Sequence, residues 1–315
     1  MSHQSVRPLA RGTSIRDALD GAVTAIAAAG CETPRLDAEL LLAQALGVSR
    51  ERLLIARLAT GNTASGEAVA EASVASQGEP KSVEDELVVT GPAVRIFQDF
   101  VRRRSVEREP VAYILGRRHF RHLELAVDPR ALIPRPETEL LVELALDLSA
   151  GARVLDVGTG SGAVALALKD ERPDLHVTGS DLSEAALALA RANGQRLGLD
   201  LHWLAADLLD GVLDEYDAVL SNPPYVPDGD RATLAPEILR HEPVSALFAG
   251  ADGLEAIRPL LRQASALPSV RLLALEVGAG QAGVVGELMR AAGFANVRAE
   301  RDLAGIERVV VGERS

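Results

Sequence analysis

The chain has little cysteine, no long apolar run and a shortage of positive charge. Cys31 is its only cysteine, which excludes an intrachain disulfide and a metal site built from several thiolates. No segment reaches the roughly 18 consecutive apolar residues that a membrane helix needs, and residues 1–12 lack the apolar stretch of a secretory signal. We therefore expect a cytoplasmic protein without a membrane partner.

The shortage of positive charge bears on the partners of the chain. Its 45 acidic and 33 basic side chains give a formal net charge of −12 and a pI near 5.1. Because basic surfaces supply most of the affinity for nucleic acid, we expect no direct sequence-specific binding to it. Two arginine clusters, 102–104 and 117–118, are typical of solvated faces, and the alternative is a docking surface for an RNA-rich partner.

Length and composition predict more than one domain. The 315 residues, 47% of them hydrophobic, can bury a full core and leave room for a second small domain. Apolar spacing, N-cap signals and glycine stops predict helices over 14–29 and 33–46, from near 49, and over 93–105. Residues 61–91 hold few large apolar groups, which predicts a flexible acidic insertion.

The rest of the chain reads as a hairpin linker followed by an α/β domain. The predicted domains are a helical region over 1–108, a linker over 109–135 with a strand at 120–127, and an α/β domain over 136–315. In the last, strands are expected at 153–157, 175–179, 201–205, 216–221, 270–277, 295–300 and 306–312, with helices over 136–148, 161–169 and 183–197. This alternation predicts a mostly parallel sheet with helices on both faces.

A glycine-rich loop follows the first of these strands. It contains Gly158, Thr159, Gly160, Ser161 and Gly162. Its glycines let the backbone approach a ligand, and the helix that follows points N–H groups at an anion. A nicotinamide cofactor and S-adenosylmethionine would both use such a loop. The spacing departs from the G-x-G-x-x-G fingerprint, which favours S-adenosylmethionine.

Acidic residues follow the next two strands. Asp181 lies about 20 residues after the glycine loop, where a carboxylate can accept hydrogen bonds from ribose hydroxyls. Asp207 and Leu208 follow the third strand and are placed for the amine and the ring of an adenine. The alternative is that both acids are helix N-caps or loop residues.

The tetrapeptide Asn222-Pro223-Pro224-Tyr225 directly follows another strand. The Asn222 side-chain carbonyl and the Pro223 peptide carbonyl offer two acceptors in a turn that the prolines stiffen. Two fixed acceptors suit a planar NH2 group, either a carboxamide or the amine of a nucleobase. Ligands bind beyond the carboxyl ends of parallel strands, so the glycine loop and this tetrapeptide are predicted to share one site.

These motifs and their flanking blocks resemble the protein-(glutamine-N5) methyltransferases of the HemK/PrmC family. The similarity covers 109–312: PVAYILG at 110–116, LIPRPETE at 132–139, the glycine loop, NPPY at 222–225, EP at 242–243, ALF at 246–248, DGL at 252–254 and RDLAG at 301–305. NPPY alone also occurs in adenine methyltransferases, so the flanking blocks carry the specificity. The resemblance implies a Rossmann-like class I methyltransferase sheet with a small N-terminal helical domain that docks the substrate.

The resemblance also implies an activity and a set of site residues. The activity is methylation of the glutamine in the Gly-Gly-Gln loop of class I peptide chain release factors. The cofactor would be held by the loop from Gly158 to Gly162 and by Asp181, Asp207, Leu208 and Asn222, and the glutamine amide by Asn222, Pro223, Pro224 and Tyr225, of which Asn222 and Pro223 are catalytic.

Other readings stay open. The same pocket chemistry fits a glutamine methyltransferase of a ribosomal protein or an adenine-N6 methyltransferase, and a non-catalytic cofactor-binding regulator is a third class. His119 and His122 have metal-site spacing without a third ligand, so no metal is expected. Arg135 and Glu137 are either support for the pocket or simple helix caps. Trp203 is expected in the core or pocket wall.

Overall fold

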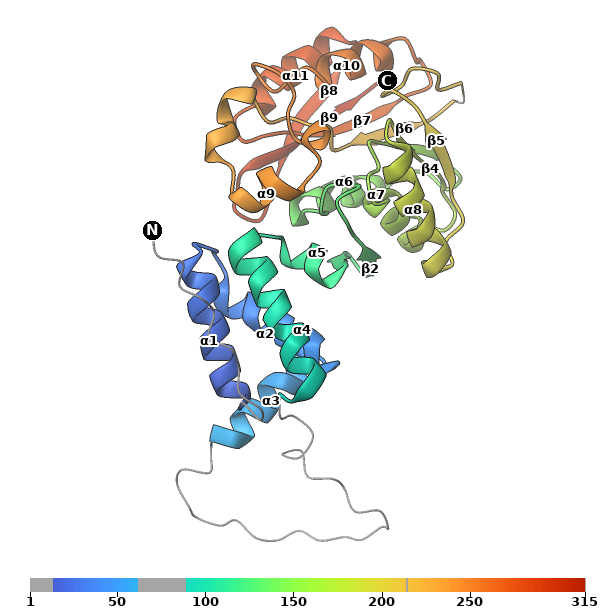
Figure 1. The fold of residues 1–315 in the computed structure, drawn as a ribbon. Coiled ribbons are helices and arrows are strands. Elements are labelled where there is room, and N and C mark those ends of the chain that lie inside the picture. The colour runs from blue at the N-terminus through green and yellow to red at the C-terminus, as the bar shows by residue number, and fades with distance from the viewer. Residues whose placement is uncertain (1–13, 62–88, 214, 315) are drawn as a thin grey trace. The chain divides into compact units, whose positions relative to one another are not determined.

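The structure is a computed structural model that describes residues 14–61, 89–213 and 215–314. The chain forms two compact units, Met1–Leu115 and Gly116–Ser315, which are described separately below (Figure 1). Residues 109–135, treated as one linker in the sequence analysis, are divided between these units. The predicted insertion at 61–91 falls mainly on residues 62–88, which lie outside the described part. Within that part, no helix is long and apolar enough to cross a membrane.

The first unit is helical, as predicted. Its helices are α1 (Ile15–Ala28), α2 (Pro34–Leu46), α3 (Arg50–Gly61), α4 (Gly91–Arg102), the π-helical turn η2 (Arg103–Glu107) and α5 (Val111–Leu115). Ser14 caps α1 by accepting a hydrogen bond from the Asp17 N–H. Gly47 ends α2 with a φ of 66°, a left-handed conformation that glycine adopts without strain. Apolar side chains of α1, α2 and α4 form the core of this unit.

A buried ion pair joins two elements of the helical unit. The Arg104 Nε of η2 donates to the Asp37 Oδ2 of α2 at 2.6 Å, and both side chains are less than a tenth exposed. Removing one member of such a pair leaves the other charge buried without compensation. The pair therefore makes the packing of η2 on α2 depend on both residues.

The second unit opens with a hairpin, and the strand expected over 120–127 corresponds to its second strand. Strands β1 (Arg117–Phe120) and β2 (Leu123–Ala126) are antiparallel and meet at a tight turn. Arg121 in this turn has a φ of 51°, which is uncommon for a residue with a Cβ. Its N–H donates to Glu139 and its guanidinium to Glu143 and Glu171. The second strand is shorter than the one expected over 120–127, because these distant carboxylates hold a turn at its start.

The main sheet has seven strands in the described residues, in the order β5-β4-β3-β6-β7-β9-β8. Their bounds are β3 (Arg153–Val157), β4 (His176–Asp181), β5 (His202–Ala205), β6 (Ala218–Ser221), β7 (Leu272–Glu276), β8 (Asn296–Arg301) and β9 (Glu307–Glu313). Strands β3 to β7 pair in parallel, and β9 is antiparallel to both β7 and β8. The chain order reverses between β3 and β6, which is where open α/β sheets bind ligands.

Helices cover both faces of this sheet (Figure 1). They are the 3-10 turn η3 (Pro136–Thr138), α6 (Glu139–Ala145), α7 (Ala163–Glu171), α8 (Glu184–Leu197), η4 (Asp228–Thr233), α9 (Pro236–His241), η5 (Val244–Ala246), α10 (Ile257–Ser265) and α11 (Ala282–Ala291). Successive strand residues point to opposite faces, so Val154 packs with α6 and α7 while Leu155 packs with α10 and α11. The predicted α/β fold with a mostly parallel sheet is confirmed.

Candidate functional site

A cavity of about 890 Å³ lies beyond the carboxyl ends of β3, β4 and β6. It lies wholly within the second unit. Among its lining residues are Gly158, Gly160, Asp181, Asp207 and Asn222. The structure thus brings the glycine loop, the two predicted acids and the start of the NPPY turn to one cavity. Thr159, Ser161, Leu208 and Pro224 also line it, whereas Gly162, Pro223 and Tyr225 do not.

The glycine loop adopts a conformation that needs glycine. Gly158, Gly160 and Gly162 have φ values of 71°, 57° and 85°, which are strained for other residues. A Cβ at Gly162 would lie 2.9 Å from Leu166 and 3.1 Å from the Trp203 ring. Trp203 therefore packs behind the loop, and its position is that of a support, not of a cavity wall.

Asp156 ties the end of β3 to the loop and to helix α7. Its Oδ2 accepts hydrogen bonds from the Thr159 hydroxyl at 2.6 Å and from the Ala165 N–H at 3.2 Å. Complete burial raises the pKa of the Asp156 carboxyl to about 7, and these hydrogen bonds oppose the rise. The carboxyl thus fixes the loop from behind, although it also borders the cavity.

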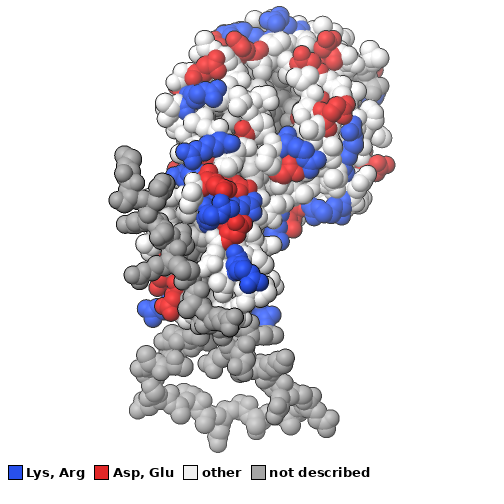
Figure 2. Space-filling model, in the orientation of Figure 1, with Lys and Arg blue, Asp and Glu red and all other residues white. Residues whose placement is uncertain are grey.

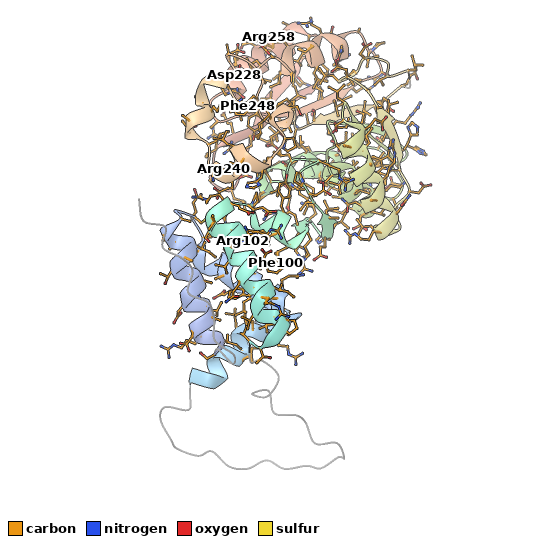
Figure 3. The ribbon with its side chains drawn as sticks, in the orientation of Figure 1. Phe100, Arg102, Asp228, Arg240, Phe248 and Arg258 are labelled. Carbon is orange, nitrogen blue, oxygen red and sulfur yellow. The ribbon has the colours of Figure 1, made fainter. Side chains whose placement is uncertain are left out.

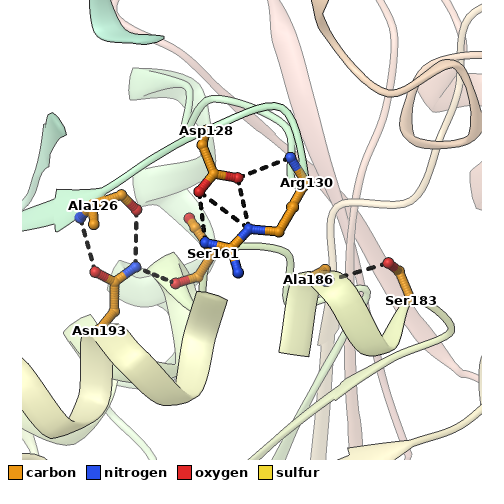
Figure 4. Close-up of polar contacts among 7 residues, drawn as sticks. All are labelled: Ala126, Asp128, Arg130, Ser161, Ser183, Ala186 and Asn193. Atoms are coloured by element: carbon orange, nitrogen blue, oxygen red, sulfur yellow. Dashed lines mark hydrogen bonds and ion pairs between the residues drawn. The ribbon is translucent and has the colours of Figure 1, made fainter. Parts of the chain in front are cut away.

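Asp181, the last residue of β4, reaches the loop from the neighbouring strand. Its two carboxylate oxygens accept hydrogen bonds from the Gly160 N–H at 2.9 Å and the Ser183 N–H at 2.8 Å. Burial raises its pKa, and backbone N–H groups oppose the rise. Ser183, not Asp181, caps α8 through a bond from the Ala186 N–H, as Figure 4 shows. Each Asp181 oxygen keeps a lone pair for a ligand.

Asn193 joins the hairpin to the glycine loop, which the sequence analysis did not foresee. It is fully buried. Its Oδ1 accepts from the Ala126 N–H, and its Nδ2 donates to the carbonyls of Ala126 and Ser161 (Figure 4). Nearby, Asp128 pairs with Arg130, a residue that lines the cavity. An asparagine inside a predicted amphipathic helix gives no sequence signal for this role.

The Asn222 side chain is held in one orientation by a chain of hydrogen bonds. Asn222 Nδ2 donates to Thr138 Oγ1 at 3.1 Å, and the Thr138 hydroxyl donates to Glu276 Oε2 at 2.6 Å. The Tyr225 hydroxyl donates to Glu276 Oε1 at 3.3 Å. Burial raises the pKa of Glu276 to about 7 and also raises that of Tyr225. Asn222 Oδ1 accepts no hydrogen bond from the described residues, so it is free to accept one from a ligand.

The backbone of the NPPY turn is also fixed. Ser221 donates through its hydroxyl to the Val157 carbonyl at 2.8 Å, which joins β6 to β3. The Gln281 Nε2 donates to the Tyr225 carbonyl at 3.0 Å. A Cβ at Gly253 would lie 2.2 Å from that carbonyl oxygen, so only glycine fits there. The turn cannot shift without disturbing three other segments.

The segment before η3 closes another side of the cavity. Glu242 is buried, and it accepts hydrogen bonds from the Ile133 N–H at 3.2 Å and from Arg135 at 2.6 Å. Arg135 lines the cavity but Glu137 does not. Phe248, labelled in Figure 3, lines it too, and the Arg231 guanidinium lies 4.0 Å from the centre of its ring. Sequence reasoning had left the role of Arg135 open and had assigned none to Glu242.

These residues fit S-adenosylmethionine. The cavity volume is in the range of roughly 300–1,000 Å³ that holds small molecules. A Cβ at Gly158 would lie 4.0 Å from the Asn222 carbonyl oxygen, so the glycine loop and the NPPY turn face each other across one space. Asp181 and Asp207 border that space and can accept from hydroxyl and amine groups.

Comparison with known proteins agrees with this geometry. Residues 136–250 match the model of the methyltransferase small domain, and residues 17–69 match the PrmC N-terminal domain. In solved structures, the catalytic domain of hMettl16 in complex with MAT2A 3'UTR hairpin 6 has the same fold, with a TM-score of 0.51 and 15% identity over 73% of this chain and 85% of that one.

Two curated relatives are much closer in sequence. The release factor glutamine methyltransferase of Gloeobacter violaceus is 48% identical over 218 residues, which cover 67% of this chain and 76% of that protein. The release factor glutamine methyltransferase of Deinococcus radiodurans is 39% identical over 307 residues, 96% of this chain and 99% of that protein. With both units matched along their length, the chain belongs to the family of release factor glutamine methyltransferases.

Proposed function

We propose that this chain transfers a methyl group from S-adenosylmethionine to the side-chain nitrogen of the glutamine in the Gly-Gly-Gln loop of class I peptide chain release factors. The observation that carries the proposal is the Asn222 amide. Its NH2 is engaged by Thr138, which leaves its oxygen as an acceptor at a cavity that also contains the glycine loop. Family membership supplies the substrate class.

The residues that would hold the cofactor line one side of the cavity. The loop from Gly158 to Gly162 would take the methionine part, Asp181 the ribose hydroxyls, and Asp207 with Leu208 the adenine. Leu208 has a φ of 56°, an unusual conformation that marks a constrained turn beside the cavity. When bound, the cofactor would supply a methyl group on a positively charged sulfur, and a nucleophile that bonds to the methyl carbon would release the sulfur as a neutral thioether.

The NPPY turn would hold the reacting amide nitrogen. An amide nitrogen is a poor nucleophile because its lone pair is delocalised. Asn222 Oδ1 and the Pro223 carbonyl would accept hydrogen bonds from its two N–H groups. These bonds would point the nitrogen lone pair at the methyl carbon and stabilise the positive charge that develops on the nitrogen. Methyl transfer to the neutral nitrogen would give an N-methylated, N-protonated amide cation, which is very acidic and loses its proton to water without a strong base. Pro224 would border the substrate, and Tyr225, which does not line the cavity, would stiffen the turn through its hydrogen bond to Glu276.

The charge distribution favours a protein substrate over nucleic acid. On the face of the second unit that Figure 2 shows, acidic and basic side chains are interspersed and no large basic patch forms. A net charge of −12 also disfavours binding to nucleic acid, for which basic surfaces supply most of the affinity. We accordingly propose a cytoplasmic enzyme whose partner is the release factor, with no membrane or sequence-specific nucleic acid partner.

The proposal is tested by offering the enzyme three substrates. Purified chain and methyl-labelled S-adenosylmethionine are incubated in parallel with a class I release factor, with ribosomal proteins and with DNA. We expect label only in the release factor. Label in a ribosomal protein or on adenine would keep the pocket chemistry and refute the partner, and no label anywhere would refute the enzyme assignment.

A further inference from the structure

We propose that Thr138 and Glu276 are positioning residues that set which way the Asn222 amide faces, and so make its oxygen available to the substrate. The proposal rests on the function proposed above. Thr138 lines the cavity and Glu276 does not, and both are assigned a role that acts through Asn222. Thr138 ends η3 and Glu276 ends β7, and they meet behind the NPPY turn.

The contacts form a directed chain. Glu276 is 1% exposed and has hydrogen bonds to both of its carboxylate oxygens, from Thr138 and from Tyr225. An ionised carboxylate only accepts, so both hydroxyl protons must point toward it. The single proton of Thr138 is then committed, and its oxygen can only accept from Asn222. The NH2 group of Asn222 must face Thr138, 3.1 Å away.

Reversal of the amide would be unfavourable. With the amide turned over, Asn222 Oδ1 would face the oxygen of Thr138, and two acceptors would meet without a proton between them. The cost of leaving a buried polar group unsatisfied favours the orientation with the NH2 toward Thr138 by about fivefold or more. When Glu276 is ionised, the cavity is therefore presented with a carbonyl oxygen in most molecules, which is what an incoming NH2 group needs.

The charge state of Glu276 decides whether the chain keeps its direction. Burial, with a smaller contribution from Glu137, raises the pKa of Glu276 to about 7, while the hydroxyls of Thr138 and Tyr225 and the Arg308 cation lower it. Above that pH the carboxylate is an acceptor only. Below it one oxygen carries a proton and can donate to Thr138, so that the direction of the chain is no longer fixed.

Three variants test the role of this chain by kinetics. Thr138→Val keeps the shape but removes the acceptor, Thr138→Ser keeps the hydroxyl, and Glu276→Gln provides an NH2 that can reverse the chain. We expect Thr138→Val and Glu276→Gln to lower kcat by about tenfold to a hundredfold with little change in KM or in cofactor affinity. Thr138→Ser should retain most of the wild-type kcat. A Thr138→Val enzyme with wild-type kcat, or a Thr138→Ser enzyme as slow as Thr138→Val, would overturn the proposal.

A second measurement does not depend on activity. The chain has four asparagines, at 62, 193, 222 and 296, so ¹⁵N-asparagine labelling gives a sparse NMR spectrum in which Asn222→Asp identifies the Asn222 NH2 pair. We expect one of its protons to exchange slowly in the wild type and in Thr138→Ser, and fast in Thr138→Val. Unchanged exchange in Thr138→Val would contradict the positioning role.

The two measurements separate this inference from the proposed function. If the wild type does not methylate the release factor, the proposed function fails, and the NMR comparison still decides whether Thr138 orients Asn222. If Thr138→Val does not fold, as judged by its melting temperature, Glu276→Gln and Thr138→Ser decide the outcome by the same two readouts.

Discussion

Two buried or partly buried carboxylates, Asp156 and Asp181, accept hydrogen bonds from the glycine loop and the residues that follow it. Asp181 accepts hydrogen bonds from the N–H groups of Gly160 and Ser183 while it faces the cavity. Asp156 accepts hydrogen bonds from the Thr159 hydroxyl and the Ala165 N–H, and it is entirely buried. The acid nearest the glycine loop in sequence is thus a support, and the more distant one is placed to contact the ligand.

Neutralising Asp181 should weaken cofactor binding. Hydrogen bonds to a charged group contribute about 1.5–3 kcal/mol, so Asp181→Asn is expected to raise the dissociation constant of S-adenosylmethionine by about tenfold to a hundredfold. Titration calorimetry measures this directly. Asp174→Asn is the matched control, because Asp174 pairs with Arg172 away from the cavity. Equal affinities for the wild type and Asp181→Asn would mean that Asp181 does not contact the cofactor.

Glu276 should make the second unit less stable as the pH rises. Its pKa is about 7 in the folded chain against an ordinary 4.5, so between these values the folded state keeps a proton that the unfolded state has lost. Stability falls with pH across this window. Glu276→Gln removes the effect, so its unfolding free energy relative to wild type should rise by up to about 3 kcal/mol between pH 5 and pH 8.

Urea unfolding at the two pH values, followed by the fluorescence of Trp203, measures this difference. Trp203 is the only tryptophan of the sequence and lies in the second unit, so the fluorescence signal is specific to that unit. Asp156 is present in both proteins, and its own pH dependence cancels. A difference between variant and wild type that does not change with pH would mean that the pKa of Glu276 is not raised.

At the scale of elements, the glycine loop depends on what packs beneath it. A Cβ at Gly179 of β4 would lie 2.5 Å from the Trp203 ring and 2.9 Å from Thr159 Oγ1. Gly179→Ala should therefore destabilise the unit by about 1–3 kcal/mol through overpacking and also weaken cofactor binding. Calorimetric melting checks the first effect. Gly229→Ala is the control, since nothing lies within 4 Å of a Cβ at Gly229, and a similar melting temperature for both would contradict the packing argument.

The elements that could be predicted from sequence are those with strong local patterns. Each strand of the main sheet was expected to within a few residues, because the apolar runs and glycine or proline stops are local signals. The hairpin was expected, but the position of its turn at Arg121 was not, because the left-handed backbone there is held by Glu139, Glu143 and Glu171, which lie far away in sequence. Local patterns carry no information about such partners.

The candidate site likewise has features that the sequence predicts and contacts that only the folded chain reveals. That the glycine loop and Asn222 border one cavity follows from each lying at the carboxyl end of a parallel strand. The bond between Thr138 and Glu276 joins residues 138 apart in sequence, and no spacing rule connects them. The bond between Asn193 and the loop is of the same kind. Residues that position others could thus be found only from the folded chain.

At the scale of the whole molecule, the two units should be separable in function. Asp37→Ala would remove the carboxylate that pairs with the buried Arg104, at a cost of about 3–5 kcal/mol to the helical unit. We expect this variant to bind S-adenosylmethionine normally but to methylate the release factor with a much higher KM. Asp99→Ala is the control, because the ion pair of Asp99 with Arg102 is about half exposed. A normal KM for a variant whose helical unit has unfolded would exclude that unit from docking.

The central claim is that the Asn222 turn directs methyl transfer to a glutamine side chain. Tandem mass spectrometry of a class I release factor, treated with S-adenosylmethionine and either wild type or Asn222→Ala, tests it most directly. We predict a single added methyl on the side-chain nitrogen of the Gly-Gly-Gln glutamine with the wild type, and at most a trace with a variant that still binds the cofactor. Equal methylation by both proteins, or a methyl on another residue, would contradict the account.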